Sequence, residues 1–391
     1  HYGVPIPVWY CEKCDQEIVA EEKQLPVDPL TDAPPVKKCP NPKCGYSKFV
    51  PEKDVLDTWA TSSLTPQIAA SLFPTIYNKL YPMTLRPQAH DIISFWLFNT
   101  VVKSYLHSKK SPWHETMISG WALDPRGEKM SKSKGNIIEP RSMIAKYSAD
   151  ALRFWAASSK LGEDVPFMEK ELVTGKKTIT KLWNAAKFSY QHLEDYETGG
   201  KKGISLKFSD LEPMDKWLLI KFNLAAKAAT EFFDAYNFSE ARKVAEQLFW
   251  HDFCDNYLEI SKHRLYNAEK TSKERLSAQY TLHTVFLGIL KMFAPIMPYI
   301  TEELYQAKYA KTSGKSIHLT TWPAHDGKMM ADSDPAFEAG ELAISIISEV
   351  RKHKALNKMS MKQELAKVVV EAPFDLKKLK RAALNSFKED V

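Results

Sequence analysis

The sequence contains no apolar run of the roughly 18 residues that a membrane-spanning helix needs. The longest candidate, residues 284–300, is interrupted by Lys291 and carries two prolines near its end, so we expect a buried helix there. The N-terminus has no pattern typical of a signal peptide, and we expect a cytoplasmic protein without a membrane partner. Hydrophobic residues make up 44% and charged residues 26%, which excludes disordered, collagen-like and coiled-coil chains.

Several catalytic motifs are also missing. Residues 314–316 end like a phosphate-binding P-loop, but Tyr309 stands where the required glycine would be. Residues 114–115 begin like a zinc-protease helix, but Ile118 replaces the second histidine. No G-x-S-x-G is present. These absences exclude P-loop enzymes, zinc proteases of that type and serine hydrolases with a nucleophile elbow.

Cysteine is scarce and grouped. Of five cysteines, Cys11 and Cys14 form a C-x2-C, Cys39 and Cys44 form a C-x4-C, and Cys254 stands alone. Two close pairs in one short segment can aim four thiolates at one ion, so we predict a structural Zn²⁺ with no open position. Two disulfides or four free thiols are the alternatives, and the lack of a secretory signal argues against disulfides. Cys254 is expected to be a small core residue.

The 391 residues suggest two or three domains. We expect a multidomain protein that combines α/β and all-α parts. A mildly basic composition, 54 Lys+Arg against 48 Asp+Glu, is compatible with an RNA partner. The expected parts are a zinc-binding ribbon at 1–52, an α/β domain at 53–158, an antiparallel helix bundle at 159–325 and a small α/β tail at 326–391.

Hydrophobic periodicity supports these assignments. The pattern predicts a strand at 81–86, a helix at 90–106 and a strand at 115–120, which form a βαβ unit with a parallel sheet. In the tail, we expect a helix at 337–353, a strand at 366–370 and a helix at 376–387. The bundle is predicted from long apolar stripes, of which the clearest contains Leu282, Val285, Phe286, Ile289, Leu290 and Phe293.

One loop is rich in lysine and serine. Residues 129–136 read Lys-Met-Ser-Lys-Ser-Lys-Gly-Asn. Lysine ammonium groups are compact cations suited to phosphate oxygens, and hydroxyl and backbone N–H groups add hydrogen bonds. Such a loop can close over a triphosphate and stabilise negative charge as it develops. A solvated basic loop is the alternative for a generic lysine run.

This run resembles the KMSKS signature of class I aminoacyl-tRNA synthetases at all five positions of the signature. Residues 2–11, 54–63, 149–153 and 181–188 resemble further segments of the Val/Ile/Leu subgroup of that family. The resemblance implies the second half of a Rossmann-type parallel-sheet catalytic domain, followed by a helical anticodon-binding domain. It also implies ATP and Mg²⁺ as ligands, and a monomer.

The resemblance assigns residues to the nucleotide site. Lys129 and Lys132 are implied to act on the ATP phosphates and on the transition state of amino-acid activation. Asp91 is implied to accept a ribose hydroxyl, although capping of a helix is an equal alternative. The family usually has glycine at the position of Ala89. The complete set implied for ATP is Lys129, Met130, Ser131, Lys132, Ser133, Asp91 and Ala89.

The choice of amino acid rests on two segments. Residues 57–66 and 85–93 resemble the valine-specific, archaeal-like members of the subgroup, with isoleucine as the alternative. The resemblance implies that Trp59, Ile92 and Trp96 line the side-chain pocket, because a branched side chain needs an apolar slot. Plain core tryptophans are the alternative reading. The implied partners are therefore valine, ATP and tRNA(Val).

RNA contacts are expected on the helix bundle. Unpaired bases stack on aromatic side chains and phosphates attract lysines, so Lys187, Phe188, Lys176 and Lys177 are the candidates. For each of them, a solvated basic face over a core phenylalanine is at least as good an explanation.

The family's His-x-Gly-His signature is absent from the sequence. We therefore expect a C-terminal piece of a longer enzyme, lacking the first half of the catalytic domain and the editing domain, that does not activate valine alone. A stand-alone, non-catalytic tRNA-binding protein derived from a synthetase is one alternative. A zinc-ribbon nucleic-acid-binding protein with a coincidental lysine loop is the other.

Overall fold

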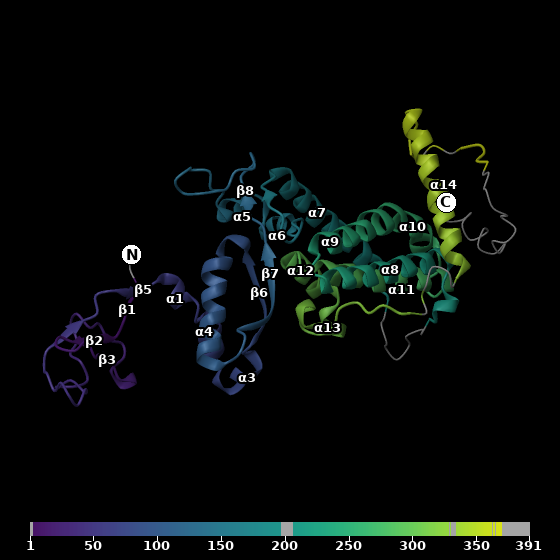
Figure 1. Ribbon diagram of the computed structural model, residues 1–391. Coiled ribbons are helices and arrows are strands. Elements are labelled where there is room, and N and C mark those ends of the chain that lie inside the picture. Colours follow the sequence, from purple (N-terminus) through teal and green to yellow (C-terminus); the bar gives the residue numbers. More distant parts are fainter. Residues whose placement is uncertain are drawn as a thin grey trace. The chain divides into compact units, whose positions relative to one another are not determined.

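The structure is a computed structural model that describes residues 3–196, 206–327, 329, 334–361, 363 and 365–369. The chain divides into two compact units, His1–Trp121 and Ala122–Val391. Among the described residues, no helix combines the length and the apolar character needed to span a bilayer. Figure 1 labels the elements along the chain.

The first unit opens with a three-stranded antiparallel sheet in the order β3–β2–β4. Strand β2 spans Val8–Cys11, β3 spans Glu17–Val19 and β4 spans Phe49–Pro51. The period-two alternation of β2 buries Trp9, which is 2% exposed and donates its Nε1–H to the carbonyl of Pro29. This indole is the centre of a small core that holds the surrounding loops in place.

A second antiparallel pair and several short helices follow. Strands β1 (Val4–Pro5) and β5 (Val55–Leu56) pair beside Gly3. A Cβ on Gly3 would lie 2.1 Å from the carbonyl oxygen of Leu56, so only glycine fits there. The short helices of this unit are η1 (Glu22–Gln24), α1 (Thr58–Ser62), α2 (Thr65–Ser71), η2 (Pro74–Ile76) and α3 (Tyr77–Leu80).

The predicted βαβ unit is confirmed. Strands β6 (Met83–Ala89) and β7 (Trp113–Ser119) are parallel, in a register that runs from Met83 opposite Trp113 to Ala89 opposite Ser119. The crossover contains a 3₁₀ turn, η3 (His90–Ile92), a π turn, η4 (Ile93–Leu97), and α4 (Phe98–Ser108). The regular helix therefore begins later than residue 90, because the chain leaves the strand through two irregular turns.

The second unit begins with another short parallel pair, β8 (Ala122–Leu123) and β9 (Val165–Pro166). The helices α5 (Pro140–Tyr147) and α6 (Ala149–Ala156) lie between these strands in the sequence. Asp150 on α6 accepts hydrogen bonds from the backbone N–H groups of Tyr299 (3.2 Å) and Ile300 (2.7 Å). The carboxylate thereby satisfies otherwise unpaired donors at the start of a later helix, α12 (Pro298–Lys308).

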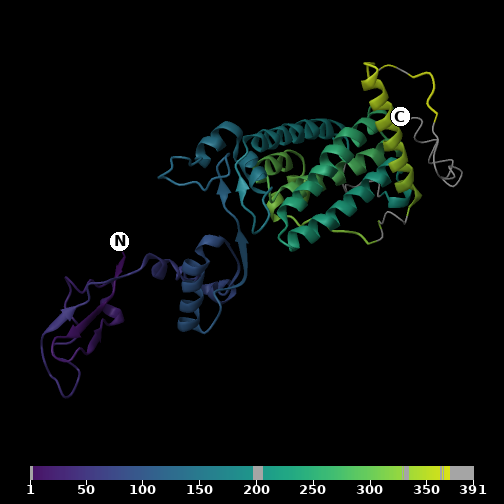
Figure 2. The same cartoon turned by 45° about the horizontal axis from the view of Figure 1, so that its top comes forward.

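Long helices form the predicted bundle, and Figures 1 and 2 show α8, α9 and α11 side by side. All six residues of the predicted stripe are buried, from Leu282 to Phe293. The predicted helix over 284–300 ends at Phe293, where a turn leads into α12. The bundle comprises α7 (Glu169–His192), α8 (Pro213–Asp234), α9 (Phe238–Gln247), η6 (Leu248–Tyr257), α10 (Leu258–Asn267), α11 (Lys273–Phe293), α12 (Pro298–Lys308) and α13 (Ala310–Ser313), with 3₁₀ turns η5 (Phe208–Asp210) and η7 (Ile317–Leu319).

The tail is partly as predicted. Helix α14 (Pro335–Leu356) covers the expected helix and packs on α8, where the Trp217 ring occupies the space beside Gly340. The predicted strand is wrong for residues 366–369, which form no strand in the described structure. In the part of the chain that the structure describes, no strand lies beside this short apolar segment to pair with it, and a short strand is not stable alone. The expected helix at 376–387 lies outside the described residues.

Candidate functional site

The lysine-rich loop is closed at its base by Asp124 and Asn136. Asp124 is 2% exposed and accepts hydrogen bonds from the backbone N–H groups of Arg126 (2.9 Å) and Glu128 (2.8 Å). It also accepts one from the Asn136 amide (3.1 Å), and Asn136 accepts one from the N–H of Ser131 (3.0 Å). The Glu128 N–H, more than any other contact, lowers the pKa of Asp124, which is therefore ionised at neutral pH.

The tip of the same loop presents cations and hydroxyls to solvent. Lys132 and Ser133 are exposed, and Gly135 turns the chain with φ of 65°. The Ser131 hydroxyl accepts a hydrogen bond from the N–H of Lys134 (3.3 Å) and lies 3.2 Å from the Ser133 hydroxyl. The backbone of Lys129 forms an antiparallel bridge, and Met130 is half-buried with its sulfur 3.4 Å from the N–H of Ile138. The hydrogen-bonded base of the loop therefore holds an exposed tip that is positively charged.

In the first unit, Ala89 is the last residue of β6 and Asp91 is exposed in η3. The carboxyl ends of parallel strands are where open α/β sheets bind their ligands. The N-cap position of η3 is occupied by Ala89, so Asp91 stands in the first turn and not at the N-cap. The roles of both residues in ATP binding remain predictions.

Two of the three predicted pocket residues lie where α1 packs against η4. Trp59 is half-buried on α1 and stacks on Phe95, with ring centroids 5.9 Å apart. Trp96 on η4 is 5% exposed and donates its Nε1–H to the carbonyl of Ser62 at the end of α1 (3.3 Å). Ile92 is half-buried just before η4. The structure therefore brings Trp96 next to the helix that carries Trp59.

Trp96 is held by a stack that the sequence did not reveal. The Arg86 guanidinium carbon lies 3.5 Å from the centroid of the Trp96 ring, and the Trp113 ring is nearly parallel to it at 5.5 Å. Burial lowers the pKa of Arg86, which nevertheless keeps its charge. Arg86 and Trp113 lie on adjacent strands, so only the pairing of β6 with β7 brings them to one indole.

The four clustered cysteines converge. Their sulfur atoms all lie within 4.8 Å of one another, with Cys11 to Cys44 at 3.7 Å and Cys14 to Cys39 at 3.6 Å. A tetrahedral zinc site with Zn–S bonds near 2.3 Å places its sulfurs about 3.8 Å apart. The observed distances match that spacing and are far longer than a disulfide bond, so the disulfide alternative is wrong for these pairs. The donor set fits Zn²⁺.

Short local turns aim these thiols. The Cys39 N–H donates to the carbonyl of Tyr46 (2.7 Å), and the Cys44 N–H donates to the carbonyl of Asn41 (2.9 Å). Burial alone would raise the pKa of Cys11, but the backbone N–H groups of Lys13 and Cys14 lower it to about 7. Backbone donors of this kind favour the thiolate form that a metal binds.

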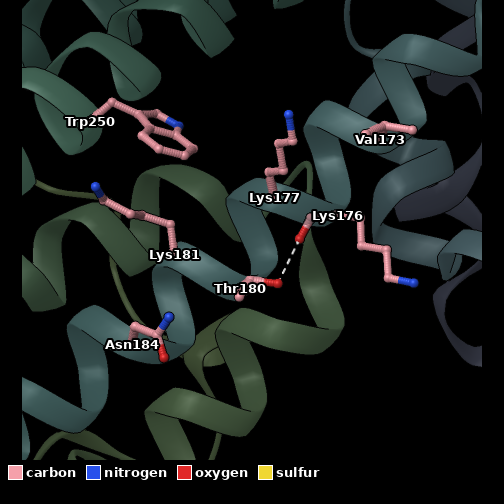
Figure 3. Close-up of a pocket in the computed structure, with 7 residues that line it drawn as sticks. All are labelled: Val173, Lys176, Lys177, Thr180, Lys181, Asn184 and Trp250. Atoms are coloured by element: carbon pink, nitrogen blue, oxygen red, sulfur yellow. Dashed lines mark hydrogen bonds between the residues drawn. The ribbon is translucent and has the colours of Figure 1, made fainter.

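The predicted RNA-contacting residues share the outer face of α7. Lys176, Lys177 and Lys187 are exposed and Phe188 is half-buried. Phe188 stacks edge-on against Tyr266, which is 58% exposed. Between α7 and η6 lies a groove of about 380 Å³. Figure 3 shows its lining residues, which are Val173, Lys176, Lys177, Thr180, Lys181, Asn184 and Trp250.

Two residues that line this groove, Lys181 and Trp250, were not predicted from the sequence. Lys181 on α7 pairs with Asp255 (3.3 Å), and its ammonium group lies 4.9 Å from the centre of the Trp250 ring. Trp250 stands in an aromatic stretch that predicts only a buried stripe. Trp250 lies between the buried Phe249 and the exposed His251, so it stands at the edge of that stripe. This position in the pattern is the signal from which its place at the surface could have been predicted.

Comparisons with known proteins agree with this arrangement. Residues 1–168 match the family model "tRNA synthetases class I (I, L, M and V)", and residues 215–370 match "Anticodon-binding domain of tRNA ligase". A curated valine–tRNA ligase of Haloarcula marismortui is 43% identical over 94% of this chain. The chain belongs to the class I tRNA synthetases. The chain spans only 39% of the length of the Haloarcula relative.

Other members of the family agree. The valine–tRNA ligase of the Wolbachia species of Brugia malayi is 41% identical over 99% of this chain and 45% of its own length. The leucyl enzyme of Agrobacterium radiobacter K84, solved with tRNA and LeuAMS, is 20% identical with a TM-score of 0.62 over 84% of this chain and 41% of its own. The methionyl enzyme of Mycobacterium tuberculosis, solved with methionyl-adenylate, is 19% identical with a TM-score of 0.51 over 69% of this chain and 55% of its own. These two structures establish the class I synthetase fold.

Proposed function

We propose that this chain forms part of a valine–tRNA ligase. Such an enzyme joins the carboxylate of valine to the α-phosphorus of ATP and releases pyrophosphate. It then transfers the valyl group to a terminal ribose hydroxyl of tRNA(Val) and releases AMP. The observation that carries the proposal is 40–43% identity to eight valine–tRNA ligases over at least 94% of this chain.

The lysine-rich loop supplies electrostatic catalysis of the first step. Negative charge grows on the phosphate oxygens as pyrophosphate leaves, and fixed cations stabilise that charge more than the ground state. Lys129 and Lys132 are the proposed cations, and Mg²⁺ bound with ATP shares this role. Ser131 and Ser133 are proposed to orient the loop. Because Asp124 and Asn136 fix the base, the loop can meet the phosphates without first being ordered.

The amino-acid and ribose sites are proposed in the first unit. Trp59, Ile92 and Trp96 are proposed to form the apolar slot for the branched side chain, and Asp91 beside Ala89 to meet the ribose. Cys11, Cys14, Cys39 and Cys44 are proposed to hold a structural Zn²⁺, which neutralises the thiolates and pins the ribbon together.

The bundle is proposed to bind tRNA through the outer face of α7. Lys176, Lys177 and Lys187 match the charge of RNA phosphates, and Phe188 offers an aromatic edge to a base. The complete enzyme is proposed to be a cytoplasmic monomer.

The test is valine-dependent ATP–pyrophosphate exchange by the full-length natural polypeptide that contains these residues. Isoleucine and leucine serve as competing substrates, and this 391-residue chain alone is assayed in parallel. We expect exchange with valine by the full-length protein only. Lys132→Ala should lower the rate by about 100-fold, whereas Lys134→Ala, whose exposed ammonium faces Glu128 at 3.5 Å, should lower it far less. Faster exchange with isoleucine would favour the isoleucyl alternative, and no exchange with retained tRNA binding would favour the binding protein.

A further inference from the structure

The groove between α7 and η6 combines an aromatic ring with a dense group of cations. Figure 3 shows Trp250 reaching toward α7 from the neighbouring helix, with Lys177 and Lys181 on either side of it. Lys176 points away from the indole in the same view, and the Thr180 hydroxyl is tied to the Lys176 carbonyl (3.1 Å). The lining therefore contains one aromatic ring on which a base can stack and two lysines beside that ring.

We propose that this groove holds one unpaired nucleobase of the tRNA on the Trp250 indole, with the adjoining phosphate on Lys177 and Lys181. The proposal rests on the proposed function and names a subsite within its RNA-binding surface. Single-stranded nucleic acid is bound where aromatic rings lie in a positively charged groove, because stacking tolerates any base and lysines follow the backbone. A neutral ligand with a flat ring would use only the indole, and an anionic ligand without a flat ring would use only the lysines.

The charge around the groove supports an anionic occupant. In the described part of the chain, Lys176 and Lys177 make no ion pair, so their charges face solvent. The acidic partner of Lys181 is Asp255, whose carboxylate also lies 3.6 Å from Nδ1 of His251. The residues that line the groove include no acidic side chain, and Lys177 and Lys181 flank the indole, so positive charge predominates where a phosphate would lie.

Lys181 can change partners at little cost. Its ion pair with Asp255 is partly solvated, with side-chain exposures of 34% and 45%, and such pairs contribute little to stability. Its ammonium group lies over the Trp250 ring at 4.9 Å. A base that stacks on this ring displaces the ammonium group, which then becomes available to the phosphate on the same nucleotide.

The two walls of the groove are held firmly from behind. On α7, Leu182 and Ala185 are buried, and a Cβ on Gly175 would lie 3.0 Å from the Cα of Ala151. On the other side, Trp250 belongs to a π-helical segment whose neighbours Phe249 and Phe253 are fully buried. π-Helical turns are rare and are frequently found at functional sites. The indole is therefore placed by core residues and does not depend on the ligand for its position.

The test uses the full-length enzyme and direct tRNA binding, measured by filter retention, so that it does not depend on charging activity. Trp250→Ala should weaken binding by roughly five- to 100-fold, the range that stacking of one base accounts for. Trp250→Phe should restore most of the affinity, because a phenyl ring also stacks. Tyr299→Ala is the control, since Tyr299 is an aromatic residue that is 68% exposed on α12 and lines neither the groove nor the face of α7.

The salt dependence of tRNA binding distinguishes the contribution of the lysines from that of the Trp250 ring. Lys177→Ala should reduce the slope of log affinity against log salt by about 0.7, the value for one phosphate contact on a single strand. Trp250→Ala should leave that slope unchanged. Unchanged affinity of Trp250→Ala, or equal losses for Trp250→Ala and Tyr299→Ala, would overturn the proposal. Absence of valine exchange with normal tRNA binding by the wild type would instead overturn the proposed function and leave the groove testable.

Discussion

Arg264 donates two hydrogen bonds to the carboxylate of Asp215 inside the helix bundle. Its Nη1 lies 2.7 Å from Oδ2 and its Nη2 lies 3.1 Å from Oδ1, with side-chain exposures of 8% and 0%. Asp215 also accepts hydrogen bonds from the hydroxyls of Tyr257 (2.7 Å) and Ser277. One carboxylate thus joins α8, α10 and α11 and the end of η6. It lets the bundle bury a charged pair within an otherwise apolar interior.

Asp215→Ala should lower the free energy of unfolding by about 3–5 kcal/mol, because it leaves the Arg264 charge buried without its partner. The measurement is urea unfolding followed by far-ultraviolet circular dichroism. The control is Glu259→Ala, which removes an exposed pair with Lys262 (2.7 Å) and should cost less than about 1 kcal/mol. Equal losses for the two variants would contradict a central role for Asp215.

The cysteine cluster should bind one zinc ion per chain. Plasma emission spectrometry on purified, extensively dialysed protein should find zinc, and Cys39→Ser should remove it and expose the ribbon to proteolysis. Cys254→Ala is the control, because Cys254 is buried in the bundle and distant in sequence from the cluster. Zinc retained in Cys39→Ser would mean that the metal lies elsewhere.

The base of the lysine-rich loop should matter for nucleotide chemistry. In the full-length enzyme, Asp124→Ala should lower kcat/KM for ATP by about five- to 100-fold, the cost of leaving its hydrogen-bond donors unpaired. Arg126→Ala on the same loop should have little effect, since its side chain is 75% exposed and 3.6 Å from Asp124. A wild-type rate in Asp124→Ala would show that the lysines need no fixed base.

The stability of the bundle should fall in mild acid because of His283. Burial, with repulsion from Lys308, lowers the pKa of His283 to about 4, against an ordinary value of 6.5. The unfolded chain therefore takes up a proton between pH 6.5 and 4 that the folded chain refuses, and the free energy of unfolding decreases as the pH falls through this window. The full loss is about 3 kcal/mol.

The test compares urea unfolding at pH 7.5 and about pH 5, conditions chosen from this titration window. His283→Gln should lose less stability between the two conditions than the wild type does. His263→Gln serves as the control, because His263 is exposed on α10. The same loss in His283→Gln as in the wild type would assign the acid sensitivity to other groups.

Local patterns predicted much of this molecule. The 3.6-residue period identified the buried face of α11, and the order of strand, helix and strand predicted the parallel pairing of β6 with β7. The spacing of four cysteines predicted their convergence. In each case the residues that form the pattern lie within about 35 positions of one another, and the known geometry of helices, strands or metal sites then predicts how they are arranged.

What escaped prediction depends on contacts between distant parts of the chain. Arg86 meets Trp96 and Trp113 only after two strands align, and nothing near Arg86 in the sequence indicates a stack. Trp250 joins α7 from 69 residues beyond Lys181. The sequence also provides no sign that the chain leaves β6 through a 3₁₀ turn whose N-cap position is Ala89, which places Asp91 in the first turn. Hydrophobic periodicity does not report such irregular turns.

The hydrogen bond between Asp124 and Asn136 also constrains how this loop can vary among natural sequences. The bond joins two points 12 residues apart, so an insertion or deletion between them would separate the carboxylate from its amide. Substitutions at the exposed tip leave that closure intact. Natural selection should therefore act more strongly on the number of residues between Asp124 and Asn136 than on the identity of several residues in this segment. Insertions and deletions there should be much rarer than substitutions.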